Sequence, residues 1–384
     1  METVKGFKDK TGKDAQAAAL IREVARQTFE KYNFSELETP IVEYEEFVKG
    51  GADEGDDAIS EIFRLQDKGK RNLALRYEFT FQLKRIAQNQ KLPFKRFQIG
   101  PVFRDEPVKG NRLRQFTQCD IDTIGAKVKD QAELLTAVQE IMTALKINST
   151  IYVNNRKLLN EILEEQKIEN KIDAIRELDK LDKLPEDEVR ANLENIGAEK
   201  LLDVVKQPKE YFKKYPAYSE IEELEEYCSY YGVKIEFQPT LARGLSYYTG
   251  NVYEIKSSDI KETICGGGTY MVGDNLASGI SFSIERMMAV SNIIVDIDKI
   301  LIVSLNEDKK AIEISSQLRK QGKNASVFFG KPAKAFDYAE AYGIKRIIFV
   351  GKQECESKKF KVKDINTGKE VIITIEQKKK IKLE

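Results

Sequence analysis

The sequence predicts an α+β domain that carries a helical insertion, followed by a small α/β domain. Three stretches support this prediction. Residues 97–125 have the pattern of a long β-hairpin, residues 156–231 are dominated by helix formers and charges, and residues 300–350 alternate strand, helix, strand, helix, strand. At 384 residues the chain is longer than a typical single domain, so two or three domains are expected.

The order of elements before the long hairpin is helix, strand and a shorter hairpin. Residues 13–32 place apolar side chains along one helical stripe, and residues 34–39 form a short strand that stops at Pro40. Residues 62–76 predict a hairpin around a polar turn. Glu78 follows, where strand gives way to helix. It either complements the helix dipole there or faces a ligand.

The long hairpin has an unusual polar face. If residues 116–123 form a strand, four of their side chains share one face: Phe116, Gln118, Asp120 and Asp122. The loop before them holds four cations: Arg104, Lys109, Arg112 and Arg114. This combination suits a ligand that carries a phosphate, a ring and an ammonium group. The alternative is an ordinary solvated hairpin with mixed charges.

Strand and helix alternate again after the insertion. Residues 233–237 and 252–255 have strand patterns, and residues 278–286 lead into a helix. The C-terminal βαβαβ pattern has near-continuous apolar strands, which is typical of a parallel sheet, and a final hairpin follows it. This part has no Gly-rich phosphate loop, so no Rossmann nucleotide site is expected there.

Composition limits the chemistry. The chain contains no histidine, which excludes Ser-His-Asp and Cys-His catalysis, histidine-bound metals and a histidine general base. Its four cysteines lie far apart without a CxxC pair, so neither a disulfide framework nor a cysteine zinc site is indicated. No apolar run reaches membrane-spanning length and the first residues do not resemble a signal peptide. A reducing, cytoplasmic location is therefore expected.

Charge is uneven along the chain, although its net value is zero. Residues 299–384 hold 20 Lys and Arg against 11 Asp and Glu, whereas the remainder holds 43 against 52. A basic C-terminal module on an acidic body suits contact with nucleic acid. A solvated lysine-rich surface has the same composition, so both interpretations stay open.

Several segments resemble motifs of the class II aminoacyl-tRNA synthetases. The helix and strand before Pro40 resemble motif 1, and residues 278–286, which end in Arg286, resemble motif 3. Motif 2 is matched by Phe103-Arg104-Asp105-Glu106, Arg112, Arg114-Gln115-Phe116 and Gln118. The run that continues to Asp122 is most similar to the form found in the histidyl-tRNA synthetase family.

Two glycine-containing segments resemble signatures of that family. Residues 241–250, LARGLSYYTG, place Arg243 beside two tyrosines, which a glycine turn with packed tyrosines does not explain. Residues 265–270, CGGGTY, are similar to the second signature and end in Tyr270. Three glycines let a backbone approach a ligand closely, and taken alone they predict a loop.

The resemblance implies a domain organisation. Residues 1–297 are expected to form a class II catalytic domain built on an antiparallel sheet, with the helical insertion at about 156–231. Residues 298–384 are expected to form an anticodon-binding domain with the βαβαβ fold. A homodimer is also expected, formed largely through motif 1.

The resemblance implies an activity as well: ATP-dependent ligation of L-histidine to tRNA(His) through a histidyl-adenylate, with release of AMP and pyrophosphate and with Mg²⁺ accompanying ATP. By position, ATP is expected to bind Arg104, Arg112, Phe116 and Arg286. Histidine is expected to bind Glu78, Thr80, Gln118, Asp122, Arg243, Tyr247, Tyr248 and Tyr270. Arg104 and Arg243, at the α-phosphate, are the expected catalytic residues.

This chemistry needs no histidine in the enzyme. Attack of a carboxylate on the α-phosphate requires charge stabilisation and alignment rather than a proton shuttle. Asp122 is expected to accept the imidazole N–H, with Tyr248 as the second partner. A site that pairs a substrate's polar groups can discriminate by roughly ten-thousand-fold without editing.

Four residues depart from the family pattern. Ser246 replaces an acid in the first signature, Thr269 and Met271 replace arginine and aspartate in the second, and Ser283 stands where motif 3 usually has glycine. Asp120 has no assigned role.

Two other functions remain as alternatives. One is the histidyl-synthetase-like regulatory subunit of ATP phosphoribosyltransferase, which is expected to lack both the C-terminal domain and an equivalent of Arg243. The other is a tRNA-binding protein without adenylation. The lack of histidine suggests a chain that can be made when charged tRNA(His) runs out, or simply a drifted composition.

Overall fold

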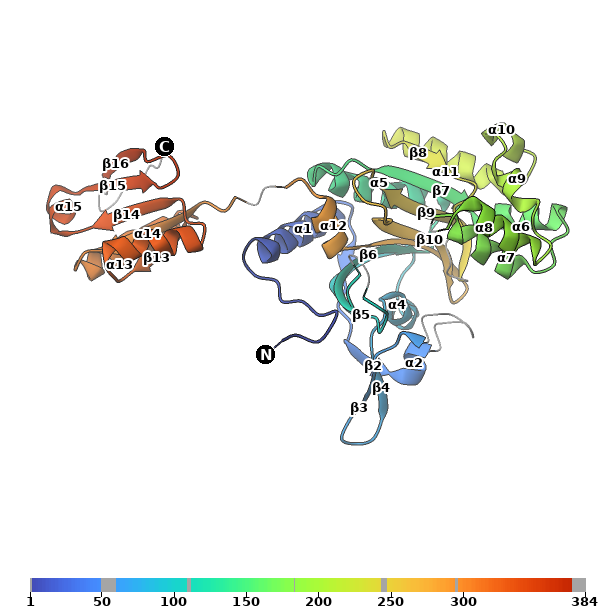
Figure 1. Ribbon diagram of the computed structural model, residues 1–384, viewed down its shortest axis with the longest axis horizontal. Helices are drawn as coiled ribbons and strands as arrows, with labels where there is room; N and C mark the ends of the chain where they lie inside the picture. The colour runs from blue at the N-terminus through green and yellow to red at the C-terminus, as the bar shows by residue number, and fades with distance from the viewer. Residues whose placement is uncertain are drawn as a thin grey trace. The chain divides into compact units, whose positions relative to one another are not determined.

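The computed structural model describes residues 2–49, 60–108, 112–182, 184–242, 247–293 and 296–374. The chain divides into two compact units, Met1–Ile293 and Ile294–Glu384, each with its own sheet (Figure 1). No helix in the described ranges is long and apolar enough to cross a membrane.

The first unit is organised around a sheet that has eight strands in the described residues, in the order β1-β5-β6-β11-β10-β9-β7-β8. The strands are β1 (Ser35–Glu36), β5 (Phe94–Phe103), β6 (Gln115–Ile124), β7 (Thr150–Asn155), β8 (Ile235–Phe237), β9 (Tyr248–Lys256), β10 (Cys265–Val272) and β11 (Asn275–Ser283). From β5 to β7 neighbouring strands pair antiparallel. β1 and β8 add in parallel at the edges. The predicted α+β fold on an antiparallel sheet is confirmed.

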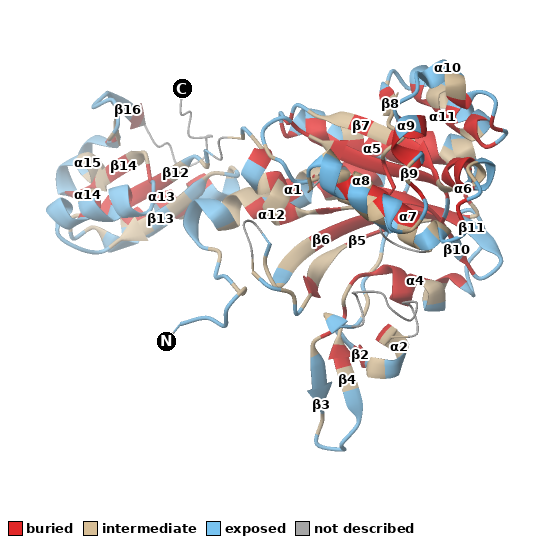
Figure 2. Ribbon diagram, turned by 45° about the vertical axis from the view of Figure 1, so that its right-hand side comes forward, coloured by how far each residue is buried: buried red, intermediate tan, exposed pale blue. Residues whose placement is uncertain are grey.

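The helices of the first unit lie mostly on one face of this sheet and in the segment after β7. They are α1 (Gly12–Lys31), α2 (Glu45–Lys49), α4 (Thr80–Ala87), α5 (Val128–Ala144), α6 (Arg156–Glu165), α7 (Lys171–Leu178), the 3-10 helix η1 (Asp179–Asp182), α8 (Glu186–Glu194), α9 (Leu201–Val205), α10 (Lys209–Phe212), α11 (Tyr218–Tyr230) and α12 (Ile284–Val290). Two of them, α2 and α4, lie elsewhere. Buried side chains concentrate along the central strands and α5 (Figure 2). α4 contributes Leu83 and Ala87 to a smaller core on the other face.

Side-chain alternation along β6 divides its residues between these two faces. Cys119 and Ile121 join the main core beneath the helices. Gln118, Asp120 and Asp122 point to the opposite face, as the period of two predicts for a strand. The sheet therefore separates an apolar core from a polar cavity, and the hairpin contributes to both.

The glycine-rich residues 265–270 belong to β10, a central strand, and not to the loop that three glycines alone predict. A Cβ at Gly267 would lie 2.1 Å from the carbonyl oxygen of Gly279 on β11. A Cβ at Gly268 would lie 2.8 Å from the carbonyl oxygen of Asn251 on β9. Both neighbouring strands come too close for a side chain, so glycine is required by packing within the sheet.

A three-stranded sheet of order β2-β4-β3 lies apart from the main sheet. It consists of β2 (Val42–Tyr44), β3 (Arg64–Gln66) and β4 (Asn72–Leu75). The β3–β4 pair is the hairpin predicted at residues 62–76. All three residues of β3 are exposed.

The second unit has a five-stranded sheet, β13-β12-β14-β15-β16, in the part of this unit that the structure describes. Its elements are β12 (Lys299–Ser304), α13 (Asp308–Lys320), β13 (Asn324–Phe328), α14 (Pro332–Ala341), β14 (Arg346–Val350), α15 (Lys352–Ser357), β15 (Lys359–Asp364) and β16 (Glu370–Thr374). β12 pairs in parallel with β13 and β14, and β15 and β16 add antiparallel. The βαβαβ pattern and the final hairpin match the sequence prediction, whereas α15 was not anticipated.

Candidate active site

A cavity of about 420 Å³ opens on the face of the main sheet that the large helical core leaves free. The predicted residues that line it are Glu78, Thr80, Arg104, Arg112, Phe116, Gln118, Asp122, Tyr247, Tyr248, Tyr270 and Arg286. Asp120 lines it too. Arg243 and Ser246 lie outside the described residues.

Arg104 is held between two aromatic rings. Its guanidinium carbon lies 4.4 Å from the centroid of the Tyr77 ring and 5.2 Å from that of Phe116. Nη2 donates to Oε1 of Gln118 at 3.4 Å, while Nε is buried without an acceptor in the described residues. An arginine fixed in this way and with an unused donor is suited to an anion such as a phosphate.

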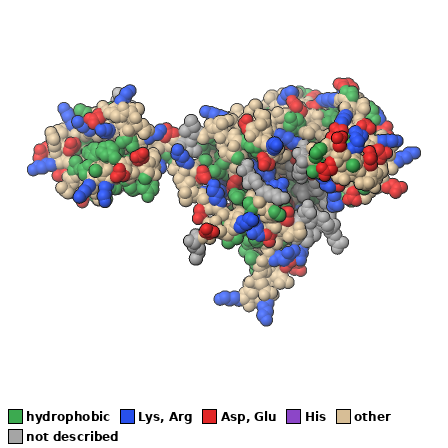
Figure 3. Space-filling view, viewed as in Figure 1, with side chains coloured by type: hydrophobic (Ala, Val, Ile, Leu, Met, Phe, Trp, Pro, Cys, Tyr) green, Lys and Arg blue, Asp and Glu red, His purple; other side chains and the backbone are tan. Residues whose placement is uncertain are grey.

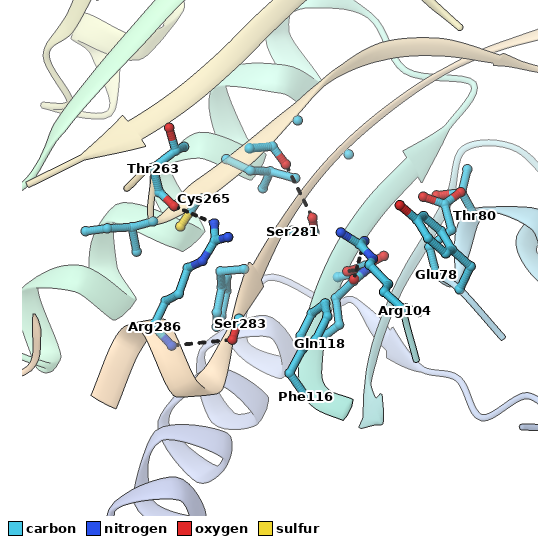
Figure 4. Close-up of a pocket in the computed structure, with 18 of the residues that line it drawn as sticks. Glu78, Thr80, Arg104, Phe116, Gln118, Thr263, Cys265, Ser281, Ser283 and Arg286 are labelled. Carbon is cyan, nitrogen blue, oxygen red and sulfur yellow. Dashed lines mark hydrogen bonds between the residues drawn. The ribbon is translucent and has the colours of Figure 1, made fainter. Parts of the chain in front are cut away.

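The two other predicted phosphate-binding arginines already have protein partners. Arg112 Nη1 lies 2.9 Å from Oε2 of Glu106 at the exposed end of the cavity. Arg286 Nη1 donates to the carbonyl oxygen of Thr263 at 2.8 Å. Figure 4 shows Arg286 and Thr263 on the opposite side of the cavity from Arg104.

Ser283, one of the departures from the family pattern, caps the helix that carries Arg286. Its Oγ accepts the backbone N–H of Arg286 at 3.3 Å (Figure 4). The same Oγ donates to Oε2 of Glu285 at 2.9 Å. Serine is among the preferred residues at a helix N-cap. Glu285 also accepts the backbone N–H of Thr117 and pairs with Lys10. The substitution therefore has a local structural reason.

Three carboxyl groups gather at the other end of the cavity. Glu78, Asp120 and Asp122 are all buried. Burial raises the pKa of Glu78 and of Asp122, and it raises the pKa of Asp120 to about 8, while nearby arginines oppose each shift. Asp120 Oδ1 accepts from Gln118 Nε2 at 2.8 Å. Such a cluster favours a cationic ligand group such as an ammonium.

Tyrosines surround Asp122. Tyr270 donates its hydroxyl to Oδ1 of Asp122 at 2.5 Å. The Tyr247 ring lies 4.8 Å from that of Tyr248 and 5.8 Å from that of Tyr270, centroid to centroid. The cavity end thus combines one acceptor carboxylate with an aromatic wall, which suits a flat polar ring.

Two residues that contact Asp122 were missed by the sequence analysis. Arg96 lies directly opposite it on β5, with Nη2 2.7 Å from Oδ2. Gly279 lies opposite it on β11, and a Cβ there would fall 1.9 Å from Oδ1. Local pattern does not single out Arg96, because Gln98 and Gly100 also interrupt the apolar residues on its face of β5, so only the register that pairs it with Asp122 reveals it.

The other two departures do not line the cavity. Thr269 is buried in β10, where its side chain lies against Gly250. Met271 is 40% exposed.

The main sheet is largely antiparallel, and its long hairpin carries Arg104. The strand β11 and the helix α12 then supply Arg286. This arrangement defines the catalytic domain of a class II aminoacyl-tRNA synthetase. The chain belongs to the histidyl-tRNA synthetase family: the family model described as "Histidyl-tRNA synthetase" matches residues 6–287. A model described as "Anticodon binding domain" matches residues 299–381.

Relatives and solved structures agree with this assignment. The chain is 33% identical to histidine–tRNA ligase 1 of Bacillus cereus, over 98% of this chain and 95% of the relative. The histidyl-tRNA synthetase of Nostoc sp. PCC 7120 superposes with a TM-score of 0.84 at 26% identity, over 97% of this chain and 96% of that one.

A Bacillus halodurans structure titled "ATP phosphoribosyltransferase regulatory subunit/histidyl-tRNA synthetase" shares the fold. Its TM-score is 0.76 at 18% identity, over 91% of this chain and 97% of that chain.

Membership of the histidyl-tRNA synthetase family implies aminoacylation of tRNA(His) with histidine.

Proposed function

We propose that the chain activates L-histidine with ATP to form histidyl-adenylate and pyrophosphate, and then transfers histidine to tRNA(His) with release of AMP. The observation that carries the proposal is the position of Arg104. It is clamped between Tyr77 and Phe116 in the same cavity as the buried acids Glu78 and Asp122. A phosphate-binding cation and an ammonium-binding acid cluster thus share one cavity.

In the first step an oxygen of the histidine carboxylate attacks the α-phosphorus and the bond to pyrophosphate breaks. No proton moves, so the residues must position the reactants and stabilise negative charge. Arg104 and Arg243 take this role at the α-phosphate. Arg112 and Arg286 hold the γ-phosphate, exchanging their present contacts with Glu106 and Thr263 for it. Phe116 stacks on adenine.

The other end of the cavity binds the amino acid. Glu78, Thr80 and Gln118 receive the ammonium group. Asp122 accepts the imidazole N–H, Tyr248 is the second imidazole partner, and Tyr247 and Tyr270 complete the wall. A ligand without the ring N–H would leave the buried Asp122 without the hydrogen bond that the substrate supplies, which is a strong basis for rejection.

Mg²⁺ enters with ATP in this proposal. Within the described ranges no group of three or more His, Cys, Asp or Glu side chains could hold a metal ion. That fits Mg²⁺, which usually takes one or two carboxylates together with substrate phosphates. Glu106, beside Arg112 in the cavity lining, offers such a carboxylate. When bound, the ion neutralises charge on the pyrophosphate.

The second unit supplies the tRNA contact. Three exposed aromatic side chains lie in and around α14. Phe329 comes directly after β13, Tyr338 is in α14, and Tyr342 comes directly after α14. Figure 3 shows hydrophobic side chains gathered on a face of this unit, with Lys and Arg as well as Asp and Glu around them. Aromatic rings that stack on unpaired bases, set among cations, are typical of single-strand RNA recognition.

We further propose that the catalytic domain spans residues 1–297 and the anticodon-binding domain residues 298–384, and that the chain works as a cytoplasmic homodimer. Motif 1, formed by α1 and β1, is the proposed dimer contact. Analytical ultracentrifugation tests whether the chain is a dimer, and a monomer at micromolar concentration would contradict the proposal.

The adenylate itself is the direct test of the activity. The enzyme is incubated with [α-³²P]ATP, histidine and pyrophosphatase without tRNA, and enzyme-bound histidyl-AMP is isolated. Addition of tRNA(His) should then transfer histidine and release AMP. Arg104→Ala and Arg243→Ala should each form the adenylate far more slowly. Failure of the parent enzyme to form it would overturn the proposal.

A further inference from the structure

Arg96 is a fully buried cation for which the proposed reaction gives no role. Its side chain is 0% exposed, and it lies on β5 directly opposite Asp122. Burying an arginine is costly unless an acid compensates its charge. The compensating acid is Asp122, the residue proposed to recognise the substrate ring. Arg96 therefore acts on a residue of the specificity pocket from inside the sheet.

Arg96 interacts electrostatically with two buried acids, Asp120 and Asp122. Arg96 lowers the pKa of both Asp120 and Asp122, against the stronger effect of burial on each. Nη2 lies 2.7 Å from Asp122 Oδ2, yet none of the guanidinium nitrogens has an acceptor with hydrogen-bond angles in the described residues. The contact is therefore an ion pair, and the guanidinium N–H groups keep donor capacity that no acceptor in the described residues uses.

Asp122 is fixed on several sides. Oδ1 accepts from Tyr270 on β10, Oδ2 faces Arg96 on β5, and Gly279 on β11 leaves just enough space for the carboxylate. Oδ2 receives no hydrogen bond from the described residues. An acceptor that is anchored but not fully used can take an N–H from a ligand in the cavity.

The protonation state of Asp122 decides what it recognises. An ionised carboxylate only accepts hydrogen bonds, whereas a protonated one presents an O–H donor. A neutral imidazole offers one N–H donor and one acceptor nitrogen. Only an ionised, correctly turned Asp122 can select the N–H edge of the ring.

We propose that Arg96 is a positioning residue for histidine recognition, which keeps the Asp122 carboxylate ionised and turned toward the imidazole N–H without touching the substrate. The inference rests on the proposed function, because it assumes that histidine occupies this cavity. The second acid, Asp120, then carries the proton that the crowded cluster retains.

The test compares histidine binding by calorimetry with the KM values for histidine and ATP in pyrophosphate exchange. In Arg96→Met, the Kd and KM for histidine should rise about tenfold or more, while the KM for ATP stays unchanged. Arg96→Lys keeps the charge but not the planar fork, so it should recover part of the affinity. Arg85→Met, which breaks the pair with the buried Glu43 outside the cavity lining, is the matched control.

Because Arg96→Met leaves buried acids without their cation, it can fail to fold. The paired variant Arg96→Met with Asp120→Asn removes the buried cation together with one of the two neighbouring acids and carries the test in that case. It should fold and still bind histidine weakly, because Asp122 has lost its anchor. A purely structural role for Arg96 predicts a lower melting temperature with unchanged histidine affinity.

The pH profile gives a second readout. Asp122 is faced by Arg96 from β5, Asp120 from β6, Tyr270 from β10 and Glu78 from the segment before α4. Without Arg96, Asp122 takes up a proton more readily, so histidine affinity should fall more steeply than in the parent as the pH is lowered.

The outcomes separate this inference from the proposed function. A parent enzyme that binds histidine but forms no adenylate would overturn the proposed function, while calorimetry would still test Arg96. Any folded Arg96 variant that binds histidine as tightly as the parent, with the parent's pH profile, would overturn the inference. A parent that does not bind histidine would overturn both.

Discussion

The Glu285 carboxylate accepts the backbone N–H of Thr117, with distances of 3.1 Å to Oε1 and 3.0 Å to Oε2. Arg286 follows Glu285 on α12, and Phe116 precedes Thr117 on β6. One carboxylate therefore ties together the two elements that are proposed to hold ATP from opposite sides.

Glu285→Gln should loosen this connection, because the neutral amide accepts through one oxygen and loses the ion pair with Lys10. We expect the KM for ATP in pyrophosphate exchange to rise about tenfold with histidine binding unchanged. Glu23→Gln, which breaks an exposed pair with Arg26 on α1, is the control. An unchanged KM for ATP would show that Glu285 does not align the site.

Gly279→Ala should disturb histidine recognition without removing any polar group. The added Cβ would fall 1.9 Å from Asp122 Oδ1, so the carboxylate or the strand must move. Overpacking of this kind costs about 1–3 kcal/mol of stability, and the displaced Asp122 should weaken histidine binding. Gly69→Ala is the control, because its Cβ would meet the ends of the Asp67 and Arg71 side chains, at 3.3 Å and 3.8 Å. Equal histidine affinity in both variants would contradict the proposed place of Asp122.

Stability should depend on pH through Asp120. Burial raises its pKa from 3.8 to about 8, so the folded chain binds a proton there that the unfolded chain has released. The stabilisation is fully present below the unfolded pKa and is lost as pH rises through the folded pKa. The melting temperature should therefore fall between about pH 4 and about pH 8, and the fall should be smaller in Asp120→Asn. Identical slopes would mean that Asp120 is ionised throughout.

The aromatic residues of the second unit should affect tRNA and not adenylation. Stacking of one base on an aromatic ring contributes about 1–3 kcal/mol, so Tyr342→Ala or Phe329→Ala should raise the KM for tRNA(His) about tenfold or more. Pyrophosphate exchange should be unaffected. Tyr230→Ala, at an exposed tyrosine of α11, serves as control. A loss of exchange activity in the Tyr342 variant would contradict a role confined to tRNA.

Periodicity was sufficient to predict the hairpin and its two faces. The polar residues of β6 alternate with Cys119 and Ile121, and a strand must send these two sets to opposite sides. The motifs around Glu78, Arg104 and Arg286 were likewise recognisable locally, and the fold brings them to one cavity.

What sequence reasoning missed depends on register between strands. Arg96 becomes meaningful only when it is paired with Asp122 across β5 and β6. The glycines of β10 look like a loop until the crowding by β9 and β11 is known. Asp120 had no role until the other buried carboxyls around it were placed. None of these features follows from local pattern, because each depends on a neighbour distant in the chain.

ATP–pyrophosphate exchange across the twenty amino acids tests the central claim most directly. The account predicts exchange that depends on histidine, proceeds without tRNA, and is reduced by more than about a hundredfold in Arg104→Ala. Exchange with a different amino acid would contradict the histidine pocket built around Asp122. Tight histidine binding without exchange would contradict the proposed enzymatic activity and indicate a histidine-binding protein instead.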